Sequence, residues 1–552
     1  MGSTARKRRL HVTSAALLVV MLGAGVVVAA GAGASSVRES RMWRTYLQQW
    51  RRSHDAVTTT TSSTTTSSTT STTASSTTTT TTVDPPPPPS TGAPSSPPVT
   101  VCGNASQLTG PSTPPAGAVV VPAGDNSATV GTNWTMAPNT TYWFAPGVHT
   151  LGSNQFSQII PQNGDVFIGG PGAVIDGQNL NNYAFTGQAT NVTVEYLEVR
   201  HFTSPDDQGV VNHDFGAGWT IEHNYAHDNS GGAIFVGTNN VAEYNCMANN
   251  GQYGFQGAGT NLTLSYNEIA GNDTANIQGC GCQGGGKFWD ASNATVTYNY
   301  VHNNSSVGLW ADTNNRVFDI EHNYIADNAD EAIIYETSYN FKIDNNTFVR
   351  NEWAGGYSNG GFANPAVYIS ESGGDARVSA TYAQSSVSNN NFVDNWGGVT
   401  LYENADRYCT SGANTSTGYC TLDNSLWSDF STPTQCEMPT VGTSPYISDC
   451  RWKTQNVTVS GNHFSLNAAN VPHCTTANLC GENGLFSMYG TVAPFVGTAV
   501  EDHIAYGQNN HFSNNTYTGP WQFMAHDQGN VVSFAQWQAA PYGQDGSSSN
   551  TP

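Results

Sequence analysis

Short runs of alternating apolar and polar residues follow one another along the chain from about residue 170, and asparagines recur between them. The stretch 293–340 contains two copies of one pattern: an apolar alternation, an asparagine, an apolar residue, a polar turn ending in asparagine, and a second apolar run. Asn299 corresponds to Asn323, and Asn304 to Asn328. Alternation with a period of two over so few residues predicts β-strands joined by turns rather than helices.

The two asparagines form two columns along the sequence. The first column occupies positions 224, 245, 267, 299, 323 and 346, and the second occupies 229, 250, 272, 304, 328 and 351. Both columns advance by 21, 22, 32, 24 and 23 residues, so one repeat governs them and the step of 32 marks an insertion. Such a repeat of short strands predicts a solenoid whose coils stack at roughly 4.8 Å, with like asparagines hydrogen-bonded in ladders at the bends.

This pattern, opening with PGAVIDGQNLNNYAF from Pro171, resembles the right-handed parallel β-helix of the pectin-lyase-like superfamily. More narrowly, it is similar to the right-handed β-helix repeat proteins of bacterial surfaces. The resemblance covers about residues 140–545, and we expect an all-β chain with its β-helix domain at 101–545. It implies a scaffold shared by polysaccharide lyases, glycoside hydrolases, epimerases, esterases and non-catalytic adhesins, so the resemblance does not define the reaction. The catalytic motifs of that superfamily are not matched here.

The residues before the repeats predict export. Residues 1–34 have basic residues at 6–9 followed by an apolar run, which is typical of a signal peptide or of a single-span membrane anchor. Residues 35–57 form a basic segment that would lie beside the membrane, and residues 58–100 are a Thr/Ser/Pro-rich linker without the composition for a core. The repeat domain is therefore expected to be extracellular, either secreted or anchored at the cell surface.

All ten cysteines follow residue 100, and an even number of cysteines in an exported chain favours disulfides. Three local pairs are predicted, each closing a loop in the irregular C-terminal region: Cys409 with Cys420, Cys436 with Cys450, and Cys474 with Cys480. The sequence leaves four cysteines unassigned: Cys102, Cys246, Cys280 and Cys282. A zinc site at the last two is the alternative, although a second cysteine pair at ligand spacing is lacking.

The charge of the expected repeat domain limits its partners. After residue 101 the chain has nine basic and 37 acidic residues, a formal charge of −28. This charge excludes nucleic acid, which needs a basic surface, and it disfavours polyuronates unless bound calcium inverts the local charge. A neutral polysaccharide is the expected partner of a monomeric protein. No cofactor is expected, with calcium as the one candidate ion.

Three carboxylates can be aligned on consecutive coils. Placing Gly286, Gly308 and Ala332 in register aligns the segments KFWD, LWAD and IIYE. Alternation then directs the fourth residue after each small residue outward, about 5 Å from its neighbour on the adjacent coil and about 10 Å from the next. Glycoside hydrolases use carboxyl pairs about 5 to 9.5 Å apart, and crowded carboxylates raise one another's pKa. The predicted catalytic column consists of Asp290, Asp312 and Glu336.

Other residues near this column are further candidates. Lys287 would suit a lyase as the base for β-elimination from a uronate, or it would form an ordinary salt bridge with Asp290. Glu331, in the turn before the third segment, is a further carboxylate for substrate contact. Three aromatic residues could stack on sugar rings: Trp289, Trp310 and Tyr335.

The sequence therefore predicts a glycoside hydrolase acting on a polysaccharide through carboxylates on adjacent coils. Two alternatives stay open. A polysaccharide lyase or an epimerase on uronates would use Lys287, although Lys and Arg are scarce in this part of the chain. A non-catalytic glycan-binding or adhesive solenoid would use the same carboxylates as a solvated acidic face or as a structural calcium site.

Overall fold

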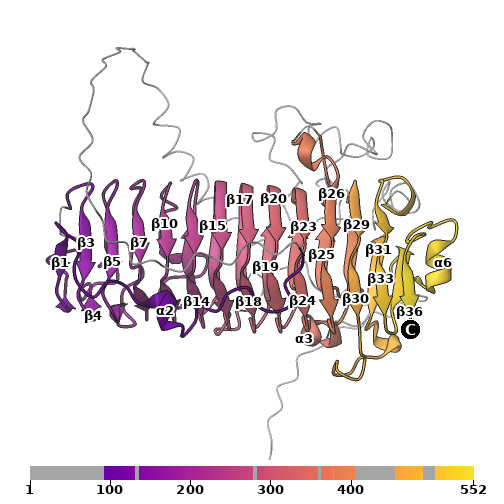
Figure 1. Ribbon diagram of the computed structural model, residues 1–552, viewed down its shortest axis with the longest axis horizontal. Coiled ribbons are helices and arrows are strands. Elements are labelled where there is room, and N and C mark those ends of the chain that lie inside the picture. Colours follow the sequence, from indigo (N-terminus) through magenta and orange to yellow (C-terminus); the bar gives the residue numbers. More distant parts are fainter. Residues whose placement is uncertain are drawn as a thin grey trace, which may run out of the picture.

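The computed structural model describes residues 92–130, 136–277, 283–358, 362–376, 378–404, 454–488 and 504–552. These residues wind into an elongated solenoid whose strands lie side by side along one axis, from the indigo end to the yellow end in Figure 1. Successive coils contribute up to three short strands, so that three stacks of parallel strands run the length of the molecule. We refer to these stacks as I, II and III.

Stack I contains β9 (Gly209–Val211), β12 (Gly232–Val236), β19 (Val307–Asp312), β22 (Ile333–Glu336), β25 (Val367–Ser370), β28 (Val399–Asn404), β31 (Glu482–Met488) and β34 (Gln522–Asp527). Stack II contains β1 (Val119–Val121), β3 (Thr141–Phe144), β5 (Val166–Gly169), β7 (Thr193–Glu195), β10 (Thr220–Glu222), β13 (Val241–Glu243), β20 (Arg316–Glu321), β23 (Tyr339–Asp344), β26 (Ser385–Ser388), β29 (Val457–Ser460) and β32 (His511–Ser513). Two long strands, β15 (Tyr253–Ser265) and β17 (Gly284–Thr297), belong to stacks I and II together.

Stack III contains β2 (Gly124–Asp125), β4 (Gly147–Thr150), β6 (Ala173–Asp176), β8 (Glu198–Arg200), β11 (Tyr225–His227), β14 (Cys246–Ala248), β16 (Glu268–Ala270), β18 (Tyr300–His302), β21 (Tyr324–Ala326), β24 (Thr347–Val349), β27 (Asn391–Val393), β30 (His463–Ser465), β33 (Thr516–Thr518) and β36 (Ser549–Thr551). The expected parallel β-helix is thus confirmed. It continues past the predicted boundary at residue 545, since β36 pairs with β33.

The core of the solenoid lies between the three stacks. In each strand alternate side chains point inward, and their rows form one continuous buried cluster that includes Phe288, Leu309, Phe318 and Ile325. No single coil encloses this apolar interior, so each coil depends on its neighbours for burial.

The predicted asparagine ladders are confirmed. Between stacks II and III each asparagine amide donates to the next asparagine's side-chain oxygen at 2.9–3.2 Å, from Asn224 through to Asn515. Between stacks III and I the corresponding distances are 2.8–3.0 Å, from Asn229 through to Asn395. The members are buried, so the ladders satisfy polar groups that water does not reach.

A row of stacked rings follows the bend between stacks II and III. Its members directly precede the residues of the first asparagine ladder or, on the coil before it, Leu197. They have φ values of 52–58°, and consecutive ring centroids lie 4.9–5.1 Å apart. The left-handed backbone directs these side chains away from the core. The row consists of Tyr196, His223, Tyr244, Tyr266, Tyr298 and His322.

A few short helices lie outside the coils. α3 (Trp353–Ser358) follows stack III strand β24, and the 3₁₀ helices η2 (Ala380–Tyr382) and η5 (Thr476–Asn478) lie in connections. α6 (Phe534–Gln538) lies at the yellow end of the solenoid in Figure 1. Its Trp537 is fully buried and stacks on Phe523, while β35 (Val531–Val532) pairs antiparallel with β34. These elements cover the last coil.

Residues 92–111, which we call the strap, run back along the outside of the solenoid before the first coil begins. Thr347 in β24 donates to the carbonyl of Pro94 at 2.6 Å. Trp143 in β3, one of the first strands of the solenoid, donates to the carbonyl of Pro111 at 3.2 Å. Between these points lies α2 (Ala105–Leu108), drawn beside much later coils in Figure 1. The last part of the predicted linker therefore packs on the domain.

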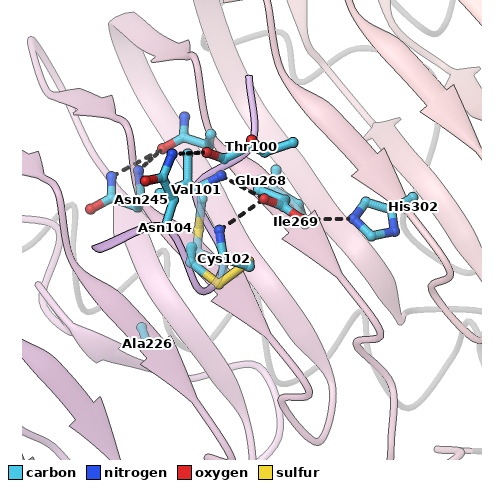
Figure 2. Close-up of a disulfide and its surroundings, with 12 residues drawn as sticks. Thr100, Val101, Cys102, Asn104, Ala226, Asn245, Glu268, Ile269 and His302 are labelled. Atoms are coloured by element: carbon cyan, nitrogen blue, oxygen red, sulfur yellow. Dashed lines mark hydrogen bonds and ion pairs between the residues drawn. A yellow bond between two sulfur atoms is a disulfide. The ribbon is translucent and has the colours of Figure 1, made fainter. Parts of the chain in front are cut away.

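A disulfide between Cys102 and Cys246 fixes the middle of the strap to β14 (Figure 2). Beside it Glu268 accepts the backbone N–H groups of Val101 and Cys102 at 2.6 and 2.8 Å, and its other oxygen lies 3.1 Å from His302 Nε2. These hydrogen bonds hold the pKa of Glu268 below its ordinary value although burial opposes them.

The disulfide predictions have mixed outcomes. The pair Cys474–Cys480 is confirmed, and Cys102–Cys246 assigns two cysteines that the sequence left open. The pairs Cys409–Cys420 and Cys436–Cys450, together with Cys280 and Cys282, lie outside the described residues. The expected signal peptide or anchor lies outside them too. Among the residues described, none of the helices is both long and apolar enough to span a membrane.

Candidate functional site

The candidate site lies on the outer face of stack I, where strand alternation presents two neighbouring rows of side chains. The first, the lysine row, contains Gln256, Lys287, Trp310 and Ile334 in register on consecutive coils. The second, the carboxylate row, contains Trp289, Asp312, Glu336 and Ser370. Outward residues on adjacent coils are separated by about one strand spacing, roughly 4.8 Å.

Lys287 is the centre of this face. Its ammonium lies 3.0 Å from Asp312 Oδ2, 4.3 Å from the ring centroid of Trp310 and 5.9 Å from that of Trp289. The side chain of Lys287 is only 3% exposed, while that of Asp312 is 15% exposed. A buried ammonium needs such partners because its desolvation is costly, and both the carboxylate and the aromatic faces supply negative potential.

Asp312 and Glu336 are adjacent members of the carboxylate row, and their Cα atoms pair in the β19–β22 register. Asp312 also accepts a hydrogen bond from the hydroxyl of Thr313 at 2.8 Å. The alignment that the sequence predicted for these two carboxylates is therefore correct. Their carboxylates come from consecutive coils, which is the separation that two-carboxylate chemistry requires.

The third carboxylate of the predicted column is placed elsewhere. Trp289, and not Asp290, pairs with Asp312. Asp290 occupies the bend after it, with φ of 47°, and its backbone N–H donates to the carbonyl of Thr313. There Asp290 Oδ1 lies 3.7 Å from a guanidinium nitrogen of Arg316. The predicted salt bridge of Lys287 is accordingly formed with Asp312 instead of Asp290.

The predicted aromatic residues divide into two groups. Trp289 and Trp310 lie on the outer face, each 8% exposed, where their rings enclose the Lys287 ammonium. Tyr335 points into the core, is fully buried, and donates its hydroxyl to the carbonyl of Tyr339 at 3.1 Å. Tyr335 was therefore a wrong choice for a sugar-stacking residue, because alternation places it between the outward residues Ile334 and Glu336.

Glu331 lies in the turn before β22, among other acids rather than on the outer face. Burial, with a further contribution from the charge of Asp330, raises the pKa of Glu331 to about 8. Burial likewise raises the pKa of Glu352 well above its ordinary range. The charge of Glu336 also contributes to the rise at Glu331, and with this raised pKa Glu331 can keep a proton near neutral pH.

Two residues that the sequence did not single out also belong to the site. Gln256 precedes Lys287 in the lysine row, and a polar residue inside the apolar run YGFQG was its signal. Asp207 lies on a loop, and its own backbone N–H donates to Gln252 Oε1 at 2.6 Å. Burial raises the pKa of Asp207, and the charge of Lys287 opposes that rise, so Asp207 lies within electrostatic reach of the ammonium.

Within the described ranges, no three His, Cys, Asp or Glu side chains are grouped so that they could hold a metal ion.

Comparison with known proteins supports the fold. Residues 216–379 match the family model described as "Right handed beta helix region". Together with the parallel stacks, this match confirms the predicted right-handed parallel β-helix. A search of curated proteins gave no match.

Several solved structures are similar to the chain at low sequence identity. The mannuronan C-5 epimerase AlgE4 A-module of Azotobacter vinelandii is 16% identical, with a TM-score of 0.34 over 52% of this chain and 85% of that one. The periplasmic alginate epimerase AlgG is 12% identical, with a TM-score of 0.34 over 63% and 78%. A mannuronic acid specific polysaccharide family 6 lyase from human gut microbiota is 11% identical, with a TM-score of 0.39 over 74% and 83%.

Proposed function

We propose that this chain is an exported carbohydrate-active enzyme that acts on a uronate-containing polysaccharide as a lyase or an epimerase, at the outer face of stack I. The observation that supports the proposal is the ion pair between Lys287 and Asp312, whose charged atoms lie 3.0 Å apart. The rings of Trp289 and Trp310 lie beside the same ammonium. Disulfides such as Cys102–Cys246 agree with a location outside the cytoplasm.

Elimination and epimerisation at a uronate share a first step, removal of the proton from the carbon that bears the carboxylate. That step needs a positive charge to neutralise the carboxylate and a base to accept the proton. Lys287 would supply the charge, and Asp312, which Lys287 and Thr313 hold in place, would accept the proton. Trp310 would stack on the sugar ring, and Glu336 would contact the neighbouring unit.

Hydrolysis is less well supported by the same geometry. A glycoside hydrolase needs one carboxylic acid as proton donor and a second carboxylate as base or nucleophile. Asp312 is paired with the Lys287 ammonium, and Asp290, the third predicted acid, lies beside Arg316 and not in the carboxylate row. Glu331 can keep a proton near neutral pH, but it lies in the turn before β22 and not on the outer face with Asp312 and Glu336.

The test measures three products from one reaction of the purified protein with uronate polysaccharides and neutral polysaccharides. Unsaturated ends indicate a lyase, deuterium incorporated from heavy water without cleavage indicates an epimerase, and saturated reducing ends indicate a hydrolase. We expect the first or the second product, on uronate substrates. Saturated reducing ends would contradict the proposal, and tight binding without any product would indicate a binding solenoid.

Lys287→Met should lower turnover by about 10² to 10⁴-fold, because the uronate would lose its neutralising charge. Asp312→Asn should have an effect of similar size. The matched control is Lys342→Met, since Lys342 also lies over an aromatic ring, 4.4 Å from the centroid of Tyr382, but on stack II. Circular dichroism spectra must show that each variant is folded. Unchanged turnover in both site variants would place the chemistry elsewhere on the solenoid.

A further inference from the structure

Gln256 lies on the coil before Lys287, in the lysine row. Its neighbours Phe255 and Gly257 face the core, so alternation directs the Gln256 side chain to the outer face, beside Lys287. The residue is only 3% exposed. Among the residues that the structure describes, neither its amide oxygen nor its amide nitrogen has a hydrogen-bond partner.

Trp310 lies on the coil after Lys287, in the same row. It is 8% exposed, and its indole N–H also has no partner within the described part of the chain. The face therefore has an unused amide and an unused indole N–H, one on each side of the lysine at about one coil spacing. Lys287 itself is fully engaged with Asp312 and the two rings.

Buried polar groups without partners are unfavourable. Each costs the desolvation of the group without the hydrogen bond that would offset it, and native proteins contain few of them. Here two such groups flank one lysine. An apolar side chain would pack equally well at either position, so stability does not explain why polar groups are there. Sites built to bind a ligand keep such groups and pair them with that ligand.

We propose that Gln256 and Trp310 are specificity-determining residues that recognise the hydroxyl groups of the saccharide unit held at Lys287. This inference rests on the proposed function for its ligand, a hexuronate, and adds the groups that read its hydroxyls. An amide offers one acceptor and two N–H groups, which suits a vicinal pair of hydroxyls, and the indole offers one N–H. Rotation about the side-chain bonds of Gln256 turns the amide toward the ligand without moving the strand.

The test combines stability with binding. Gln256→Met keeps the length and shape of the side chain and removes the unpaired amide. If the amide serves a ligand, the variant should melt about 1 to 3 °C higher than the wild type and should bind a hexuronate oligosaccharide about five- to tenfold more weakly. Calorimetric unfolding and isothermal titration measure the two effects. A structural glutamine would give the opposite change in melting temperature.

The matched control is Gln544→Met. Gln544 is equally buried, at 3% exposure, but its amide is satisfied: it accepts from the backbone N–H of Phe512 at 2.8 Å and donates to the carbonyl of Tyr542 at 3.2 Å. Its replacement should lower the melting temperature and leave oligosaccharide binding unchanged. Trp310→Phe keeps an aromatic ring, although a smaller one, and removes the indole N–H; it should weaken binding as Gln256→Met does.

The outcomes separate this inference from the proposed reaction. If Gln256→Met melted at a lower temperature than the wild type, the recognition role would be overturned. A higher melting temperature with unchanged binding would overturn it too. In either case a buried water would be the partner of the amide. A wild-type protein that binds the oligosaccharide without converting it would overturn the proposed reaction, while the binding loss would still support recognition. A wild type that binds neither the hexuronate nor its neutral hexose counterpart would overturn both.

Discussion

Asn323 shows how one residue type stabilises the bends of this solenoid. Its amide donates to the carbonyl of Val296 at 2.8 Å and to Asn346 Oδ1 at 3.0 Å, and its oxygen accepts from the backbone and the side chain of Asn299, both at 2.9 Å. The residue is fully buried. One side chain therefore satisfies polar groups of three consecutive coils.

Asn323→Leu should lower the free energy of unfolding by about 2 to 5 kcal/mol, because several buried groups would lose their partners at once. Chemical denaturation followed by circular dichroism measures the loss. The control is Asn391→Leu, whose side chain points outward from β27 and is half-buried, and which should change stability little. If Asn323→Leu were as stable as Asn391→Leu, the hydrogen bonds of the ladder would contribute nothing measurable to stability.

The ladder could be read from the sequence because asparagine recurs at the same place in each repeat, and a bend that needs its amide tolerates few substitutes. The register of Asp290 could not. The run Gly284–Gly286 offers three residues without side chains, and the sequence does not indicate which of them pairs with Gly308. The structure pairs Leu309 with Gly286, one residue away from the predicted alignment. The predicted alignment would turn Lys287 and Trp289 toward the inner face, whereas the structure places both on the outer face.

The strap is the element whose position the sequence least predicted. Its composition continues that of a linker, yet it crosses the outside of the solenoid from the coil of Thr347 to that of Trp143. Cys102 and Cys246 are 144 residues apart in sequence, and no local spacing indicates such a pair. In contrast, Cys474 and Cys480 are six residues apart, and their pairing could be predicted.

Removing the Cys102–Cys246 disulfide by the double change to serine should lower the free energy of unfolding by about 5 kcal/mol in the chain-entropy model. The reason is that the disulfide closes a loop of about 144 residues and so restricts the conformational entropy of the unfolded chain, a restriction that the variant would lose. Hydrogen exchange should then show faster exchange in the strap, where Val101 and Cys102 donate to Glu268.

The matched control is the double serine variant of Cys474 and Cys480. That disulfide closes a loop of only about six residues, and the same model gives a loss of about 2 kcal/mol, without an effect on strap exchange. If both variants lost the same stability, the entropic account of the strap disulfide would be wrong. If strap exchange were unchanged, its hydrogen bonds would suffice to hold it.

The whole molecule is strongly acidic, and the solenoid buries part of that acidity. Burial raises the pKa of Glu195 to about 7, with a further contribution from the charge of Glu222, and it raises that of Asp273 to about 6. Glu482 in β31 is 1% exposed, has no partner for either oxygen among the described residues, and burial alone raises its pKa to about 8. Composition predicted the net charge, but which acids are buried depends on strand register and could not be read from it.

These shifts predict that the folded protein becomes more stable as the pH falls from about 8 to about 5. Each raised pKa means that the folded state binds a proton more tightly than the unfolded state, in which a Glu titrates near 4.5 and an Asp near 3.8. Between the unfolded and the folded pKa of each group the folded state carries more protons, so lowering the pH favours folding. Thermal melts across this range measure the effect, and a melting temperature that rose with pH would contradict it.

Glu482→Gln supplies the control, because an uncharged amide of the same size removes one titrating group and keeps the shape. The variant should melt higher than the wild type at pH 8 and should show a weaker dependence on pH between 8 and 5. Below about pH 4.5 the direction reverses, since Glu198 and Glu268 have lowered pKa values from hydrogen bonds to His227 and His302, and their protonation costs stability. Maximum stability is therefore expected near pH 5, where the buried acids are protonated and the strap carboxylate is still charged.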